Sequence, residues 1–317
     1  MTLLLLFVVP HGLALPGVGP QHVLHGLSPL RVDASAARAP AIRMELAAEP
    51  ARRRQSYSPQ PQSSAVTMVA PPSNAPVPKN IDWVFDNNKE WVERTNKRDP
   101  ELFSRLANGQ NPRFLWIGCA DSRVPANRIL GLDVGDVFVH RNIANQALGS
   151  DINCMSVIQY AVNVLKVPHI IVCGHYDCGG VRASMENTNH GSPLENWLRN
   201  IRDVYRLNKQ ELDAIADPVA KQRRLVEINV VEQCLNIFKT GVVQRRRLAT
   251  FCDPESEYTQ PRIHAMVYDV ADGILKELDV NWAEKIAELR NIYDLYDFDA
   301  EGCQVVYPDK TSGPMPS

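Results

Sequence analysis

Features that mark several other classes of protein are scarce in this 317-residue sequence. Its longest continuously apolar run, Leu3 to Val9, is far shorter than the roughly 20 residues of a membrane-spanning helix. Lysine and arginine (34) nearly balance aspartate and glutamate (36), so no overall charge favours nucleic acid or an anionic membrane as a partner. Seven cysteines are an odd number and too few for a disulfide-stapled secreted fold. We therefore expect no membrane span and no nucleic-acid partner, and we expect the cysteines to be free thiols or metal ligands.

Several familiar metal-binding patterns are also missing. The sequence has no HExxH, no paired CxxC knuckles, and no HxE followed by PCxxC. These absences argue against a zinc protease, a zinc finger and a zinc deaminase. Cys173 and Cys178 are five positions apart, which is not the spacing of a dithiol redox motif.

The first 79 residues differ in composition from the rest. Residues 1 to 80 hold 12 of the 23 prolines and contain no tryptophan or cysteine, so we expect no packed core there. The apolar start resembles a secretory signal, and the stretch from Ala34 to Asn80, which is poor in acids, resembles a transit sequence. We predict a disordered targeting leader over 1–79 that leads to a plastid or mitochondrion; an unstructured tail on a cytoplasmic protein is the alternative. Residues 80–300 then form one domain, and 301–317 form a C-terminal tail.

From Ile81 onward, helical and strand-like patterns alternate. The apolar residues between Trp83 and Asn108 predict two short amphipathic helices. Short apolar runs predict buried parallel strands, and Asp272-Gly273 predicts a turn into an antiparallel edge strand. The expected strands are 114–118, 136–140, 169–174, 263–270 and 274–280, and the expected helices are 151–167 (capped by Asp151), 194–215, 218–247 and 282–296. We predict an α/β fold with a central, mainly parallel four-stranded sheet, an added edge strand and flanking helices.

Metal-ligating side chains follow two of these strands. The first strand leads into Cys119, and the third leads into His175 and Cys178. The carboxyl ends of parallel strands meet at one edge of a sheet, so these side chains are expected to converge. Zinc prefers thiolate and imidazole ligands, and three protein ligands leave the open position of a catalytic site. We predict one zinc ion per subunit, and we expect a helix that starts near Val181 to lower the thiol pKa of Cys178.

An acid and a base lie beside the first of these ligands. Asp121 and Arg123 are two positions apart in a turn, a spacing that allows a bidentate ion pair. The pair would keep Asp121 ionised and turned from the metal, with one oxygen left to orient a water. If the pair broke, Asp121 would become a fourth ligand and switch the site off. The alternative is an ordinary salt bridge that stabilises the turn.

The segments C-x-D-x-R, Phe138 to Asn145, and H-x-x-C-G-G together resemble the β-class carbonic anhydrases, from about Asn80 to Asp297. The resemblance implies that residues 80–300 are a catalytic domain for the reversible hydration of CO₂ to bicarbonate, with zinc-bound hydroxide as the nucleophile. It implies a homodimer, or a dimer of dimers, in which the N-terminal helices pack on a partner subunit. It also implies substrate-binding roles, in part across that interface, for Gln110, Phe138, Ile143, Tyr160 and Gly179.

The resemblance extends to a regulated bacterial-type subgroup. Trp116, Arg141 and Tyr268 match the residues that line a non-catalytic bicarbonate pocket in its allosteric members, in which bicarbonate inhibits at low pH. Packing in the core is the alternative for Trp116 and Tyr268, as it is for Gln110, Phe138 and Tyr160. The chain has Cys-Ala-Asp where many members have Cys-Ser-Asp, an exchange at a position that binds no metal.

Three other functions remain open at this point. One is a hydrolase of a CO₂ analogue such as carbonyl sulfide, and another is a structural zinc module. The third is a non-catalytic bicarbonate or redox sensor, in which the switches would be Cys154, Cys173, Cys234, Cys252 or Cys303. No histidine can be assigned as a proton shuttle from the sequence.

Overall fold

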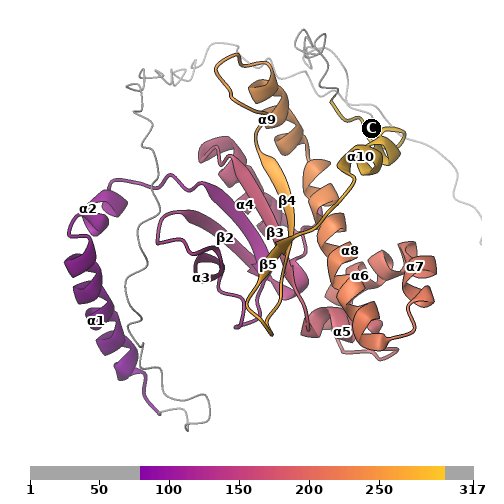
Figure 1. The fold of residues 1–317 in the computed structure, drawn as a ribbon, viewed down its shortest axis with the longest axis horizontal. Coiled ribbons are helices and arrows are strands. Elements are labelled where there is room, and N and C mark those ends of the chain that lie inside the picture. The colour runs from indigo at the N-terminus through magenta and orange to yellow at the C-terminus, as the bar shows by residue number, and fades with distance from the viewer. Residues whose placement is uncertain (1–78, 297–317) are drawn as a thin grey trace, which may run out of the picture. The chain divides into compact units, whose positions relative to one another are not determined.

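The computed structural model describes residues 79–296 (Figure 1). The predicted leader, except for its last residue, and the predicted C-terminal tail lie outside the described residues. Within 79–296, no helix combines the length and the apolar character that crossing a membrane requires.

The central sheet has five strands in the order β2-β1-β3-β4-β5 (Figure 1). The strands β1 to β4 run parallel, and β5 pairs with β4 in the antiparallel sense. Their bounds are β1 Phe114–Cys119, β2 Val137–Asn142, β3 His169–His175, β4 Arg262–Tyr268 and β5 Leu275–Glu277. The predicted fold class is confirmed, although the edge strand is only three residues long.

Helices connect and cover the strands. They are α1 Asp82–Arg98, α2 Leu102–Ala107, α3 Ala126–Leu130, α4 Ile152–Gln159, α5 Gly179–Met185, α6 Leu194–Leu207, α7 Lys209–Ala214, α8 Pro218–Phe238, α9 Gly241–Phe251 and α10 Trp282–Arg290, with a 3₁₀ turn η1 Ile143–Asn145 and a π-helical turn η2 Tyr160–Val164. Asp151 caps α4 as predicted, because its carboxylate accepts hydrogen bonds from the amides of Asn153 and Cys154.

Four predicted helices differ from those observed. The predicted helix 194–215 is divided at Asn208, whose side-chain amide donates to the carbonyl of Val204 (2.9 Å) and so competes with the helical backbone. The predicted helix 218–247 is divided at Thr240, which has extended backbone angles. The last helix ends at Arg290, before the predicted Tyr296. The first helix, α1, is 17 residues long rather than short.

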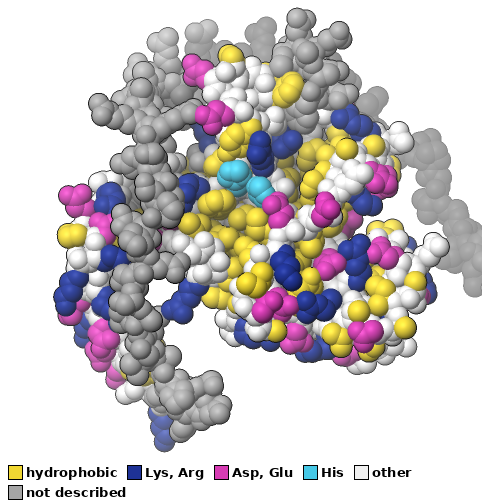
Figure 2. Space-filling model, in the orientation of Figure 1, with side chains coloured by type: hydrophobic (Ala, Val, Ile, Leu, Met, Phe, Trp, Pro, Cys, Tyr) yellow, Lys and Arg dark blue, Asp and Glu magenta, His cyan; other side chains and the backbone are white. Residues whose placement is uncertain are grey.

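The two faces of the sheet are covered unequally. On one face, Leu115, Ile117 and Val172 pack in a large buried cluster with side chains from α4, α6 and α8. On the other face, Trp116, Ile171 and Cys173 form a smaller cluster with Val124 and Ala126, at the start of α3. Hydrophobic side chains consequently reach the surface over the central strands (Figure 2).

The amino-terminal helices expose apolar side chains. Trp91 on α1 packs against Phe103 on α2, with the ring centroids 5.4 Å apart. At the start of α1, however, Trp83 is 37% exposed and Phe85 is 60% exposed. A single copy of the chain therefore leaves an apolar part of α1 uncovered.

Candidate metal centre

Three buried side chains converge at the carboxyl end of the sheet. Cys119 ends β1, His175 ends β3, and Cys178 follows in the turn before α5. Their ligand atoms all lie within 4.8 Å of one another, and the two Sγ atoms are 3.9 Å apart. The predicted convergence of Cys119, His175 and Cys178 is therefore what the fold produces.

Two residues, Asp177 in the turn between His175 and Cys178 and Gly180 just after it, fit local requirements of the backbone. Asp177 has a left-handed conformation (φ 56°), which aspartate tolerates better than most residues. Gly180 is in close contact with Ile143, because a Cβ added at Gly180 would lie 2.7 Å from the Ile143 Cγ2 atom. This close approach lets the first turn of α5 lie against the segment that follows β2.

The imidazole of His175 is oriented for a ligand. Its Nδ1 donates a hydrogen bond to the carbonyl of Tyr176 (3.0 Å), so the lone pair is on Nε2. That Nε2 atom is buried and has no hydrogen-bond partner within residues 79–296. An orphaned imidazole nitrogen beside two thiols is the donor set that zinc prefers, and the backbone carbonyl supplies the outer hydrogen bond typical of a metal-bound histidine. The three residues therefore fit a zinc ion.

The two thiols influence each other's ionisation. The hydrogen bond between Cys119 and Cys178 lowers the pKa of Cys119 to about 4, and His175 and nearby amides add to the effect. The Cys119 thiolate in turn raises the pKa of Cys178, and burial adds to the rise. The predicted effect of the helix start on Cys178 is present but is not the largest one. The amides of Gly180 and Val181 do lower its pKa, but the neighbouring sulfur outweighs them.

Asp121 and Arg123 form the predicted bidentate pair. The Arg123 Nε donates to Asp121 Oδ1 (2.9 Å), and a terminal nitrogen donates to Oδ2 (2.8 Å). These hydrogen bonds hold the pKa of Asp121 well below its ordinary value, so the carboxylate is ionised at neutral pH. Asp121 Oδ2 lies 3.8 Å from His175 Nε2, so the pair borders the metal ligands.

A second carboxylate, which the sequence analysis did not single out, also contacts this arginine. Asp177 accepts from Arg123 at 3.3 Å and from Arg182 at 2.7 Å. Its backbone carbonyl also accepts from Arg123 (3.3 Å). The only signal in the sequence was an acid between His175 and Cys178, which alone is no more than a polar turn residue.

The residues assigned to the substrate lie in three places. Ile143 and Gly179 lie next to the metal ligands, on η1 and at the start of α5. The rings of Phe138 and Tyr160 stack on one another with centroids 5.8 Å apart, and Tyr160 is 44% exposed. Gln110 precedes the amino end of β1, whereas Cys119 ends that strand about 17 Å further along. Within one subunit, β1 therefore separates Gln110 from the metal ligands.

The three residues assigned to a bicarbonate pocket share one face of the sheet. Trp116 is fully buried, its Nε1 has no hydrogen-bond partner, and its ring lies over Gly118. Gly118 on β1 pairs with Arg141 on β2, and His175 on β3 pairs with Tyr268 on β4. The Arg141 guanidinium donates to the carbonyls of Cys119 (2.8 Å) and Asp121. Arg141 thus holds the turn that carries the Asp121–Arg123 pair.

Another group of potential ligands is committed to structure. His140, Asp151 and Cys154 also place their ligand atoms within 4.8 Å of one another. The Asn142 amide is oriented by Gln146 so that it donates to His140 Nε2 (3.2 Å). Asp151 caps α4, and burial raises the pKa of the Cys154 thiol to about 12. These bonds leave no set of lone pairs directed at a common point.

Three of the remaining described thiols are poor redox switches. Cys154, Cys173 and Cys234 are buried, and desolvation raises the pKa of each thiol. Thiol reactivity depends on the thiolate, so these three groups are unreactive at neutral pH. Cys252 is only partly buried, and Cys303 lies outside the described residues. The burial of Cys154, Cys173 and Cys234 therefore disfavours these three as redox switches.

Comparisons with known proteins agree with this geometry. A sequence model of the family described as carbonic anhydrase matches residues 114–275. A carbonic anhydrase of Emericella nidulans is 50% identical over 214 residues, which are 68% of this chain and 90% of that protein. A carbonic anhydrase of Candida albicans is 35% identical over 215 residues, which are 67% of this chain and 73% of that protein.

Solved structures give the same result. A β-carbonic anhydrase of the fungal pathogen Aspergillus fumigatus matches with a TM-score of 0.59 at 36% identity, over 67% of this chain and 98% of that one. A structure from a study of two tetrameric β-carbonic anhydrases of the filamentous ascomycete Sordaria macrospora matches with a TM-score of 0.57 at 37% identity, over 63% of this chain and 96% of that one.

Proposed function

The chain belongs to the β-class carbonic anhydrases and catalyses the reversible hydration of CO₂; from this premise we propose the part that each residue of the site plays. Cys119, His175 and Cys178 hold one zinc ion per subunit. The observation that carries this assignment is the buried, unpartnered Nε2 of His175, beside two sulfur atoms that are 3.9 Å apart.

The Asp121–Arg123 pair prepares the water that attacks CO₂. When bound, the ion supplies the Lewis acidity that makes a nucleophile from water near neutral pH. Asp121 accepts a hydrogen bond from that water and fixes the direction of its lone pair. Arg123 occupies both Asp121 oxygens on the opposite side and keeps the carboxylate ionised and away from the ligands. If Asp121 left Arg123, its carboxylate would be free to act as a fourth ligand beside Cys119, His175 and Cys178, and the site would be inactive.

The apolar wall for CO₂ is shared between subunits. Ile143 and the Gly179 amide serve the metal centre of their own chain. Phe138, Tyr160 and Gln110 serve the centre of a neighbouring copy. The exposure of Tyr160 and the separation of Gln110 from Cys119 along β1 support this division.

The chain works as an oligomer built from dimers. The uncovered apolar residues of α1, Trp83 and Phe85 among them, supply a surface that a second copy covers. A related structure is described as tetrameric, so a dimer of dimers is the assembly we propose. The measurement is light scattering: Trp83→Ser with Phe85→Ser is expected to yield smaller particles than the wild type, and an unchanged mass would exclude α1 from the interface.

Bicarbonate regulates the site through Arg141. An anion that engages this guanidinium competes with the carbonyls of Cys119 and Asp121, and the buried Trp116 Nε1 is a donor with no partner in the fold. Arg141 would then release the turn that holds Asp121. Trp116→Phe removes that donor and is expected to reduce inhibition by bicarbonate at low pH. Inhibition curves that coincide with those of the wild type would remove this role.

The leader directs the protein to an organelle, a plastid or a mitochondrion. Its support is the composition of residues 1–79, rich in proline, alanine and serine and poor in acids after Ala34. Fluorescent fusions of the full chain, and of the chain without residues 1–79, test the proposal. An identical cytoplasmic distribution of the two would contradict it.

Stopped-flow CO₂ hydration, with zinc analysis of the same sample, tests the central assignment. After gel filtration in metal-free buffer, we expect one zinc per chain and a rate that rises from neutral to mildly alkaline pH. Full activity without stoichiometric zinc, or an inert zinc-loaded protein at every pH, would contradict it.

A further inference from the structure

Two histidines meet at the other end of the sheet, where β3 and β4 begin. His169 Nδ1 and His264 Nε2 are 3.0 Å apart. Their strands are adjacent and parallel, and His264 pairs with Ile171, so His169 is its diagonal neighbour on the same face. His264 is 23% exposed, so solvent reaches the pair. Histidine side chains are visible in a hollow of the face shown in Figure 2.

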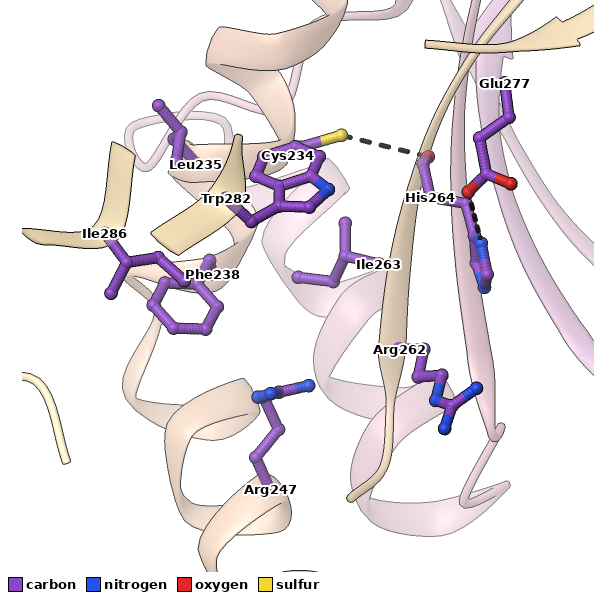
Figure 3. A pocket seen from close by; sticks show the side chains of 10 residues that line it. All are labelled: Cys234, Leu235, Phe238, Arg247, Arg262, Ile263, His264, Glu277, Trp282 and Ile286. Carbon is purple, nitrogen blue, oxygen red and sulfur yellow. Dashed lines mark hydrogen bonds and ion pairs between the residues drawn. The ribbon is translucent and has the colours of Figure 1, made fainter. Parts of the chain in front are cut away.

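The outer nitrogen of each ring also has a partner. His264 Nδ1 lies 2.9 Å from Glu277 Oε1, and the two are joined beside the pocket shown in Figure 3. A carboxylate can only accept, so His264 carries its hydrogen on Nδ1 and its lone pair on Nε2, which faces His169. His169 Nε2 lies 3.1 Å from the Tyr258 hydroxyl, a group that can donate or accept.

We propose that His169 Nδ1 and His264 Nε2 form a second metal site, which takes an exchangeable divalent transition-metal ion of the zinc and copper class. Glu277 and Tyr258 are its outer partners. This arrangement, in which a carboxylate orients an imidazole toward a metal, is common in metal sites. The inference does not rest on the proposed roles at the catalytic centre.

The separation of the two nitrogens suits one shared ion. Imidazole nitrogens that bind one ion at about 2.0–2.1 Å lie roughly 2.9 to 3.4 Å apart for angles between square-planar and tetrahedral. The observed 3.0 Å falls in this interval. Binding requires the His169 hydrogen to move from Nδ1 to Nε2, where the Tyr258 oxygen accepts it. The hydrogen stays on the His169 ring, so this rearrangement releases no proton from it.

The charges around the pair set its affinity. Burial, His264 and Arg262 lower the pKa of His169, so its ring is neutral and can act as a ligand at neutral pH. Arg262, whose guanidinium lies over the Tyr258 ring at 4.3 Å, also repels a cation. Glu277 offsets that repulsion. With two protein ligands and water at the other positions, we expect a reversible site weaker than the cysteine-containing centre.

Metal counting on the full-length zinc enzyme tests the proposal. Wild type, His169→Asn, His264→Gln and His190→Gln are dialysed against micromolar free Zn²⁺, and bound zinc is measured per chain. The differences between variants are decisive, because His11, His22 and His25 in the leader can also take up zinc. We expect His169→Asn and His264→Gln each to bind one zinc fewer than the wild type, and His190→Gln to match the wild type. Equal zinc in all four proteins overturns the site.

Two further measurements cover the case in which a histidine variant fails to fold. Glu277→Gln keeps both rings and is expected to weaken the second site about 10- to 100-fold, because it removes the partner that fixes the ring of His264. In ¹⁵N spectra of the wild type, Zn²⁺ is expected to shift the signals of His169 Nδ1 and His264 Nε2. Unshifted ring signals at saturating Zn²⁺ overturn the site. Cys119→Ser separates this proposal from the catalytic one, since it is expected to lose the catalytic zinc and keep the second.

Discussion

The strand β3 carries a histidine at each end, and the two differ in almost every respect that matters for binding a metal. His175, at the carboxyl end, is fully buried beside two cysteines. His169, at the amino end, meets one other imidazole in a place that solvent reaches. Burial and sulfur ligands favour an ion that stays with the protein, whereas two imidazoles without sulfur favour one that exchanges. The comparison shows that the surroundings of a histidine decide its role.

The largest effect is expected at the carboxyl end. Cys119→Ser removes a sulfur ligand, so catalytic zinc is lost and CO₂ hydration falls by more than about 1,000-fold. Zinc analysis and stopped-flow rates measure this. The matched control is Cys234→Ala, which removes a buried thiol elsewhere and is expected to keep both zinc and rate. A Cys119→Ser protein that retains zinc and activity would contradict the ligand assignment.

The next prediction distinguishes the role of Asp121, which orients the attacking water, from metal binding at the same end of the sheet. Asp121→Asn keeps the shape of the side chain but loses the charge that Arg123 holds, so we expect zinc to remain and kcat to fall about 100-fold. Asp99→Asn, which breaks the exposed pair with Arg105, is the control and should leave the rate unchanged. Full activity in Asp121→Asn would reduce the pair to a structural salt bridge.

A smaller effect is expected at the second partner of Arg123. Asp177→Asn removes one ion pair at 3.3 Å and another at 2.7 Å, and asparagine tolerates the left-handed backbone there. Because both pairs are largely exposed, we expect kcat to fall only about 2- to 5-fold with zinc retained. An unchanged kcat would mean that Asp121 alone positions Arg123.

The smallest effect is a difference in pH dependence between the two ends. The pKa of His169 is lowered on folding, so the unfolded chain binds more protons as the pH falls below about 6.5. Stability is then lost from that pH down to the lowered pKa of the folded state. In urea unfolding of the metal-free protein between pH 7 and 5, we expect His169→Asn to lose less stability than the wild type. The expected difference is less than about 1 kcal/mol.

A carboxylate at the other end supplies the control for that slope. The backbone amide of Ala271 and the Arg223 guanidinium lower the pKa of Asp269, which follows β4. Its contribution is therefore constant above its ordinary pKa and is lost only in stronger acid. Asp269→Asn should therefore show the same change in the free energy of unfolding between pH 7 and 5 as the wild type. If His169→Asn has the same slope as the wild type, the histidine is not the titrating group.

The convergence of Cys119, His175 and Cys178 could be predicted, because their positions relative to the predicted strands determine where they lie. Cys119 and His175 end two strands of a parallel sheet and Cys178 follows the second of them, and such strands bring their carboxyl ends together. The Asp121–Arg123 pair was predictable for the same reason, since two positions in one turn are close in any fold. The boundaries of the long helices were less predictable, because the side-chain bond of Asn208 competes locally with a helical pattern.

Other residues were missed because their partners are distant in the sequence. Asp177 gains its importance from Arg123, which is 54 positions earlier. His169 and His264 are 95 positions apart and gain theirs from each other. The effect of Cys119 on the Cys178 thiol is a similar case. The sequence predicted the helix start near Cys178, but it did not give the 3.9 Å separation of the two sulfur atoms, which are 59 positions apart.

The sequence by itself determined the α/β order of elements, the convergence of Cys119, His175 and Cys178, and the adjoining ion pair. These follow from local spacing and from the rule that parallel strands end together. Only the tertiary structure decided how close the two sulfur atoms lie, which carboxylates hold Arg123, and which histidines meet. Such properties depend on distances of a few ångströms between segments far apart in the chain, and electrostatic and hydrogen-bond energies change steeply over those distances.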